Sequence, residues 1–256
     1  MGTLARPKWL FYDFLLDLVP SEARVKNCVT GEHWVMVETD SGGCGLAHFL
    51  KRTGPTSAPD PKSFLNRPLS ELASLVKSWD NSTAAMGLAA INAVANANLQ
   101  DLKENPAPPK SACAFDFFLD RTRGRRVAVV GHFPNLDKIA DVAKLTILER
   151  NPQPGDLPDP TAEYVLDEQD VVFLTGTTII NKTLPRLMEL AQGREVYLVG
   201  PSVPMFPELF KFGFASLSGT MVINPESMAQ AVSQGLSEEI FTHGGLMVNL
   251  LKENYA

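Results

Sequence analysis

The first hundred residues switch from a helical to a strand-like pattern of apolar side chains. Apolar residues recur at helical spacing over Pro7–Leu18, which predicts a first helix that faces the core. Two strand-like runs follow, Arg24–Thr30 and His33–Glu38, and the Gly-Glu pair between them is typical of a tight hairpin. Cys44–Leu50 fits a third strand.

Two helices are predicted after this meander. Leu69–Lys77 has one apolar face, and the run TAAMGLAAINAVANA can be capped by Asp80 or Ser82. Alanines recur every four residues along the second of these helices, so it can approach another backbone closely and should be buried. A meander of strands followed by a helical pair predicts an α+β first domain.

A proline-rich stretch then breaks the pattern, and we place a linker around Asn105–Ser111. The three phenylalanines that follow it should pack against one of the domains. Beyond the linker, short apolar runs alternate with helical segments, which favours a mainly parallel sheet with helices on both faces. The predicted strands are Val127–Val130, Lys144–Leu148, Val171–Thr175, Val196–Val199 and Met221–Ile223. The expected domains are residues 1–104 and 125–256, with 105–124 between them.

The turn after the first of these strands is the stretch around which the chain is organised. In a doubly wound sheet the carboxyl end of the first strand borders the ligand crevice. Gly131 opens the turn, but His132, Phe133 and Pro134 stand where a dinucleotide fingerprint needs further glycines. We therefore expect no tight binding of NAD or a related dinucleotide. Binding of an adenosyl-type ligand is compatible with the sequence.

Two titratable groups lie at these strand ends. Glu149 is 18 residues beyond Gly131, where an acid can accept hydrogen bonds from a ribose diol, although any exposed strand end can carry a glutamate. His132 can ligate a metal or shuttle a proton. The alternative for His132 is a hydrogen-bonded turn residue, and the sequence leaves both interpretations open.

Hydroxyls and one cation follow the strand that ends at Thr175. Thr175–Thr178 closes the strand and Asn181–Thr183 opens the next helix, so hydroxyls, backbone amides and Lys182 converge in a way that suits a carboxylate or a phosphate. Helix capping by Thr183 with a solvated Lys182 is the structural alternative. Gly200–Ser202 closes a further strand in the same way.

Charge and composition limit the partners. The chain has a net charge of −6; residues 1–124 carry 13 basic and 13 acidic side chains and residues 125–256 carry 10 and 16. This argues against nucleic acid, while an acidic surface is either simply solvated or attracts cations. No apolar run is long enough for a membrane span, and Asp13 and Asp17 interrupt the N-terminal apolar stretch, so we expect no signal peptide. Three cysteines without metal-type spacing suit a reducing cytoplasm.

Several stretches together resemble one protein family, the heavy-metal chelation family. They are KSWDNSTAAMGLAAINA, VVGHFPNL, TILERNPQPGDLP, TTIINKTLPRLMELA, LVGPSVP and LSGTMV. They occur in order over most of residues 1–235 and are specific as a group. The resemblance implies an α/β protein in which an α+β enolase-N-terminal-like domain precedes a Rossmann-like domain with a mainly parallel sheet, partly similar to methyltransferases.

The resemblance also implies a ligand site between the domains. It would be formed by Lys77, Ser78, Trp79, Gly131, His132, Glu149, Thr177, Lys182 and Pro201. Trp79 would offer a flat face to a planar ligand and Lys77 a cation; alternatively Trp79 fills the helix junction and Lys77 is exposed.

We therefore hold four hypotheses of function. The first is direct binding of a metal ion, with His132 as a ligand and a divalent transition metal as the cofactor to consider. The second is an enzyme that acts on a chelator or on a pterin-like or siderophore-like small molecule. A methyltransferase and a purely structural protein are the others. Direct chelation predicts at least three converging ligands, which the spacing does not reveal. Enzymatic activity and oligomeric state, a homo-oligomer included, stay open.

Overall fold

A computed structural model describes residues 9–50, 58–100 and 113–255 of the chain. The fold is mixed α/β and consists of two compact units. Unit 1 comprises Met1–Gln100 and Asn224–Gly244, and unit 2 comprises Asp101–Ile223 and Gly245–Ala256. No helix in the described part of the chain is long and apolar enough to cross a membrane.

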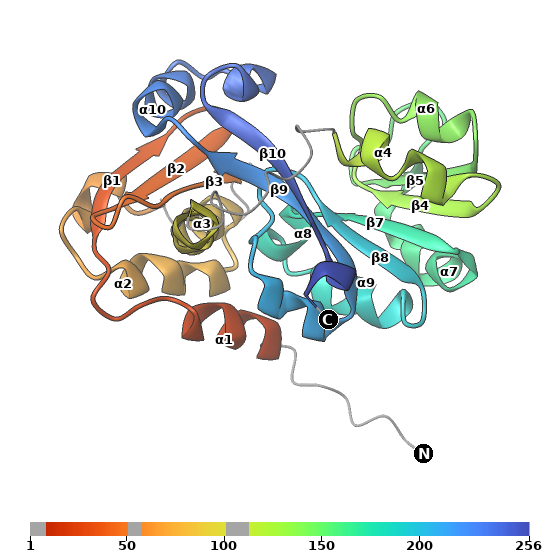
Figure 1. Cartoon of the computed structure of the whole chain (residues 1–256), viewed down its shortest axis with the longest axis horizontal. Coiled ribbons are helices and arrows are strands. Elements are labelled where there is room, and N and C mark those ends of the chain that lie inside the picture. Colours follow the sequence, from red (N-terminus) through yellow and green to blue (C-terminus); the bar gives the residue numbers. More distant parts are fainter. Residues whose placement is uncertain (1–8, 51–57, 101–112, 256) are drawn as a thin grey trace. The chain divides into compact units, whose positions relative to one another are not determined.

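Unit 1 contains a three-stranded antiparallel sheet in the order β1-β2-β3 (Figure 1). Its elements are α1 (Leu10–Asp17), β1 (Val25–Thr30), β2 (Trp34–Thr39), β3 (Cys44–His48), α2 (Leu69–Ser74), α3 (Asn81–Gln100) and α10 (Pro225–Ser233), with short 3-10 turns at Pro61–Phe64, Leu75–Lys77 and Glu238–Phe241. The predicted helix, hairpin, third strand and helical pair are confirmed, with ends that differ by a few residues. The predicted linker at Asn105–Ser111 lies outside the described residues.

Helix α3 packs against β2 and β3, as its small side chains predict. A Cβ atom placed on Gly45 would lie 2.2 Å from the backbone nitrogen of Ala93, so only glycine permits this approach. Asn92 Nδ2 donates a hydrogen bond of 2.7 Å to the carbonyl of Leu46. Asp80 caps the helix, because its Oδ1 accepts from the backbone N–H of Thr83 at 3.0 Å.

A segment from the second half of the sequence belongs to unit 1. Helix α10 starts at an Asn224-Pro225 cap and lies against β1 and β2, far from it in sequence (Figure 1). A Cβ on Gly31 would lie 1.9 Å from the carbonyl oxygen of Val232, so the β1–β2 turn and this segment meet through backbone. The predicted boundaries place residues 224–244 in the second domain, 125–256. In the structure these residues group with unit 1.

Unit 2 is built on a seven-stranded sheet in the order β10-β9-β8-β7-β4-β5-β6. Its strands are β4 (Arg126–Val130), β5 (Lys144–Glu149), β6 (Leu157–Pro158), β7 (Val171–Thr175), β8 (Glu195–Val199), β9 (Phe214–Val222) and β10 (Gly245–Leu251). All neighbours pair in parallel except β9 and β10. The chain runs outward from β4 to β6, then returns and continues from β7. The strand order thus reverses between β4 and β7, which is the switch point of a Rossmann-like sheet.

Both faces of this sheet are buried. Val127, Val129 and Phe173 contribute to an apolar cluster with Phe115 and Phe118, so the phenylalanines after the linker do pack on this unit. The alternate residues of the same strands are also buried, as expected for a parallel sheet covered on both sides. The helices are α4 (Ala114–Phe117), α5 (Leu119–Thr122), α6 (Asp137–Ala140), α7 (Ala162–Val165), α8 (Thr177–Ile180) and α9 (Leu184–Leu190), with 3-10 turns at Asp159–Thr161, Leu166–Glu168, Pro207–Phe212 and Lys252–Asn254.

Candidate functional site

The switch point places the turns after β4 and β7 side by side. The N–H groups of Gly131, Gly176 and Gly200 each donate to a carbonyl of the neighbouring strand, at 2.9, 2.8 and 2.9 Å. These amides are thus committed to the sheet and do not form a phosphate cradle. The chemistry of this edge therefore comes from the side chains that follow the glycines.

A histidine and a carboxylate form a pair directly after β4. His132 Nδ1 lies 2.9 Å from Asp156 Oδ2, and their side chains are 32% and 2% exposed. An ionised carboxylate only accepts hydrogen bonds, so Nδ1 carries the proton of this bond. The second ring nitrogen, Nε2, then has the lone pair that a metal ion or a substrate proton would use.

Two carboxylates hold the loop that carries this histidine. Glu149 Oε2 accepts from the backbone N–H of His132 at 2.9 Å, and Oε1 accepts from that of Asn151 at 3.0 Å. Asp156 Oδ2 also accepts from the N–H of Gln153 at 2.9 Å. Glu149 therefore acts first as a support for the His132 loop, although each of its oxygens retains a lone pair for a further donor. Asp156, which no sequence motif indicates, is the residue that orients the imidazole.

The hydroxyls after β7 interact with one another. Thr175 Oγ1 and Thr177 Oγ1 lie 3.1 Å apart, and Thr178 donates to the carbonyl of Thr175 at 2.6 Å. Pro201 follows β8 and is half-buried. A Cβ on Gly176 would lie 2.9 Å from the backbone carbon of Ser202, so the turns after β7 and β8 pack against each other through backbone.

Lys182 has an unusual backbone and an unusual environment. Its φ is 67°, in the left-handed region that a residue with a long side chain rarely adopts. Nζ donates a 2.5 Å hydrogen bond to the carbonyl of Ile180. Burial lowers the pKa of the ammonium group from 10.5 to about 8. A strained backbone that holds a poorly hydrated amine is the combination expected at a binding or catalytic position.

The three predicted site residues of unit 1 lie between α2 and α3. Trp79 is 72% exposed, so it does not fill the helix junction. Its ring centroid is 5.7 Å from that of Trp9, and Lys77 Nζ lies 5.7 Å from the Trp9 centroid while it pairs with Asp13. Ser78 Oγ accepts from the N–H of Asp80 at 3.1 Å. Lys77 and Trp79 thus both contact the ring of Trp9, and most of the Trp79 side chain is exposed to solvent.

Residues 9–50, 58–100 and 113–255 contain no group of three or more His, Cys, Asp or Glu side chains that could hold a metal ion. The set of three converging ligands that direct chelation predicts is thus not found there. The His132–Asp156 pair supplies one imidazole nitrogen and the carboxylate that orients it.

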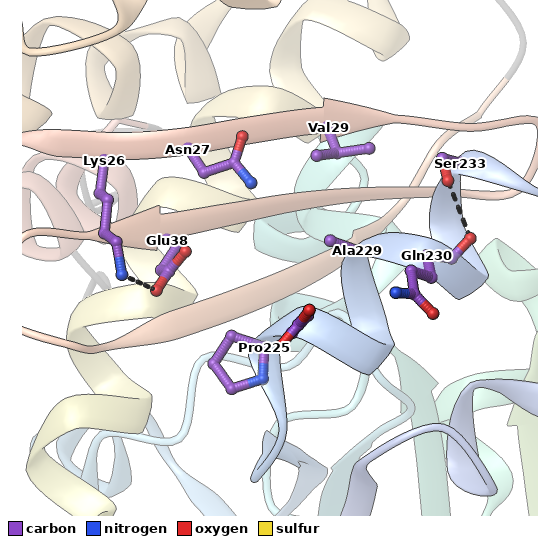
Figure 2. A pocket seen from close by; sticks show the side chains of 9 residues that line it. Lys26, Asn27, Val29, Glu38, Pro225, Ala229, Gln230 and Ser233 are labelled. Carbon is purple, nitrogen blue, oxygen red and sulfur yellow. Dashed lines mark hydrogen bonds and ion pairs between the residues drawn. The ribbon is translucent and has the colours of Figure 1, made fainter.

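An open groove of about 470 Å³ lies elsewhere in unit 1, between α10 and strands β1 and β2. Figure 2 shows its lining, in which Lys26 pairs with Glu38 at 2.7 Å and Ser233 bonds to the carbonyl of Gln230 at 2.9 Å. These polar groups already have partners within the groove. It contains none of the predicted site residues.

Two family models match the chain, and both are described as "Putative heavy-metal chelation". One covers residues 113–251 and the other residues 12–95. An uncharacterized protein of Methanocaldococcus jannaschii is 32% identical over 168 residues, which is 62% of this chain and 62% of that protein. The chain therefore spans less than two thirds of that relative's length.

Two solved structures resemble the whole chain. A protein with unknown function from Desulfitobacterium hafniense DCB-2, in the same family as the 113–251 match, has a TM-score of 0.87 at 33% identity and covers 96% of this chain and 99% of its own. A family member from Pyrococcus horikoshii has a TM-score of 0.77 at 22% identity, covers 94% and 97%, and shows the fold alone. The stretches that carried the resemblance, the strand order and these matches agree: the chain belongs to the family described as "Putative heavy-metal chelation".

Proposed function

We propose that the carboxyl edge of the seven-stranded sheet binds a metal-chelating small molecule, alone or as its metal complex, and that His132 contacts it through Nε2. The observation that carries the proposal is the 2.9 Å bond between His132 Nδ1 and the buried Asp156. A carboxylate behind an imidazole fixes its tautomer and orientation, as second-shell partners do at metal sites.

The ligand is expected to be an anion that supplies its own metal donors. One imidazole nitrogen is a weak anchor for a bare ion, but it can complete the coordination of a metal that a chelator already holds. Lys182 adds a cation when it is protonated, and its low pKa makes that charge sensitive to pH near 8. Carboxylate or phosphate groups on the chelator would be the groups that Lys182 pairs with.

An enzyme that acts on such a chelator is the second candidate. A histidine oriented by a buried carboxylate is also the arrangement of a general base, in which Nε2 accepts a proton and the carboxylate stabilises the imidazolium. Ligand binding and catalysis would both use Nε2 of His132, so the geometry does not distinguish these two functions. Turnover of the ligand would distinguish them.

The test starts from the small molecules and metals that co-purify with the chain. Elemental analysis and mass spectrometry of the retained ligand are compared for the wild type, His132→Gln and Asp156→Asn. Loss of the orienting carboxylate should lower retention about 10- to 100-fold, the usual effect of second-shell changes. His243→Gln is the matched control, because His243 hydrogen-bonds to Glu239 in unit 1. Equal retention by all four proteins would contradict the proposal.

The tautomer itself can be measured without a ligand. Long-range ¹H–¹⁵N spectra should show His132 protonated on Nδ1 in the wild type and a mixture of tautomers in Asp156→Asn. The further prediction that Lys77, Ser78 and Trp79 share the ligand stays a prediction, and Lys77→Ala in the retention experiment tests it.

A further inference from the structure

The ring of Phe133 lies over the glycine turns of the switch point. A Cβ atom placed on Gly131 would be 3.2 Å from Phe133 Cε2, and one placed on Gly200 would be 3.5 Å from Cε1 of the same ring. Thr175 stands between the two turns, with its Cγ2 3.2 Å from the Gly131 position. Because β7 separates β4 from β8 in the sheet, the ring spans the carboxyl ends of three strands.

Both glycines have backbones that favour glycine, with φ of 109° at Gly131 and 106° at Gly200. In nucleotide-binding doubly wound folds, glycine at such turns lets the ligand approach the backbone closely. Here the group that makes the close approach is a side chain of the protein. The space next to both glycine turns is therefore occupied by a ring of the protein itself.

The Phe133 ring packs on the buried core of unit 2 through Phe115. Its centroid is 5.1 Å from that of Phe115 in an edge-to-face arrangement, and Phe115 in turn is 5.2 Å from Phe173 of β7. Phe115 and Phe173 belong to the buried cluster, whereas Phe133 is only partly buried. The contact anchors one side of the ring to the core and leaves the ring itself at the surface of the crevice.

We infer that Phe133 is a specificity-determining residue that excludes nucleosides and nucleotides, adenosyl-type ligands included, from the switch-point crevice. A flat base that approached Gly131 and Gly200 from this side would need the volume that the ring occupies. Removal of the ring would leave a hole bordered by two glycines, a threonine and the Phe115 ring, which suits a flat aromatic ligand. The inference is independent of the role proposed for His132.

The test is calorimetric titration of adenosine into the full-length wild type, Phe133→Ala and Phe133→Leu. The alanine variant should bind adenosine at least tenfold more tightly than the wild type, and the leucine variant should be intermediate because part of the volume remains. Phe117→Ala is the matched control, since Phe117 packs on the same cluster and its ring lies against Phe118. It should bind adenosine as the wild type does.

Folding is checked by thermal melts of all four proteins. If the wild type already binds adenosine as tightly as Phe133→Ala, the ring does not exclude it and the inference is wrong. The same holds if folded Phe133→Ala and Phe133→Leu gain no affinity. Failure of both variants to fold would identify Phe133 as a core residue and would also overturn the inference.

Discussion

The two edges of the seven-stranded sheet use polar residues in opposite ways. At the amino edge, charged side chains are joined into a closed network. At the carboxyl edge, polar side chains are held in position by bonds that leave a reactive atom at the surface. The two edges are distinguished by the way in which the hydrogen bonds of their polar groups are satisfied.

The amino edge centres on Glu195. Arg125 Nη1 lies 2.6 Å from Glu195 Oε2, Arg121 Nη1 lies 3.8 Å from Oε1, and the Tyr197 hydroxyl also donates to Oε1. Arg121 pairs in addition with Glu253 at 2.9 Å, which ties the C-terminal turn to the sheet. The basic run before β4 is thus neutralised by the fold.

At the carboxyl edge, a buried group supports a partly exposed one. Asp156 Oδ2 accepts two hydrogen bonds and the side chain is nearly inaccessible, while the imidazole that it orients is about one third exposed. Lys182 donates to a backbone carbonyl and lies in the left-handed region. The comparison teaches that a site is better recognised by an oriented, partly exposed group with a buried supporter than by the density of charge.

Among changes at the two edges of the sheet, removal of the centre of the amino-edge network should have the largest effect on stability. Glu195→Ala removes the carboxylate that accepts from Arg125 and from the Tyr197 hydroxyl, and leaves the half-buried Arg125 guanidinium with two backbone carbonyls as its acceptors. Loss of one partner of a buried pair costs several kcal/mol, and the partial exposure of this pair reduces the expected loss to about 2 kcal/mol. Urea unfolding at pH 7 measures it.

The pH dependence identifies the cause of that loss. Burial alone would raise the pKa of Glu195, but the Tyr197 hydrogen bond and the Arg125 guanidinium outweigh it and lower the pKa below 4.5. The stabilisation is therefore complete above the unfolded value and is lost as the pH falls through the folded one. Asp120→Ala removes the exposed pair with Arg123 and should change the free energy of unfolding by less than about 0.5 kcal/mol. Equal losses in the two variants, or a loss independent of pH, would contradict the comparison.

Much of the fold can be predicted from apolar periodicity. Val171–Thr175 is a strand with the predicted ends, because five apolar or β-branched residues leave little ambiguity. Strand β9 begins seven residues before the predicted Met221, since Ser216, Ser218 and Thr220 are buried polar residues that hide the alternation.

The site was only partly predictable, because its supports come from long-range contacts. His132 and Glu149 were selected as strand-end residues. Asp156 lies in a loop with four prolines, and nothing in the local sequence indicates that it meets His132 across 24 residues. The sequence shows only that Phe133 interrupts a glycine fingerprint, because its position over Gly200 depends on the order of the strands.

The same contrast between exposed and buried groups can be tested in unit 1 with its tryptophans. Trp79 is 72% exposed, so Trp79→Ala should cost less than about 1 kcal/mol, well below the roughly 3–5 kcal/mol of a core aromatic residue. Trp34 is the buried counterpart, and its Nε1 donates to the carbonyl of Ser237 at 3.0 Å. Trp34→Ala should therefore lower the free energy of unfolding far more than Trp79→Ala does. A large loss in Trp79→Ala, measured by thermal melting, would assign Trp79 to the core.

Lys182 should have the smallest effect on stability and the clearest dependence on pH. Burial lowers the pKa of its ammonium from 10.5 to about 8, so the unfolded chain binds the proton more tightly than the folded chain between these values. Stability should therefore rise with pH from about 8 towards 10.5, by a small amount because the side chain remains partly exposed. Lys182→Met removes the titrating group and should flatten this rise while it leaves the free energy of unfolding at pH 7 unchanged or slightly higher.

The same amine should be about half neutral at pH 8, where a lysine of ordinary pKa is neutral to roughly 0.3%, so an amine-directed reagent at low dose should label Lys182 first. Peptide mapping after such labelling measures this, and uniform labelling of the lysines would show that the carboxyl edge does not hold a poorly hydrated amine.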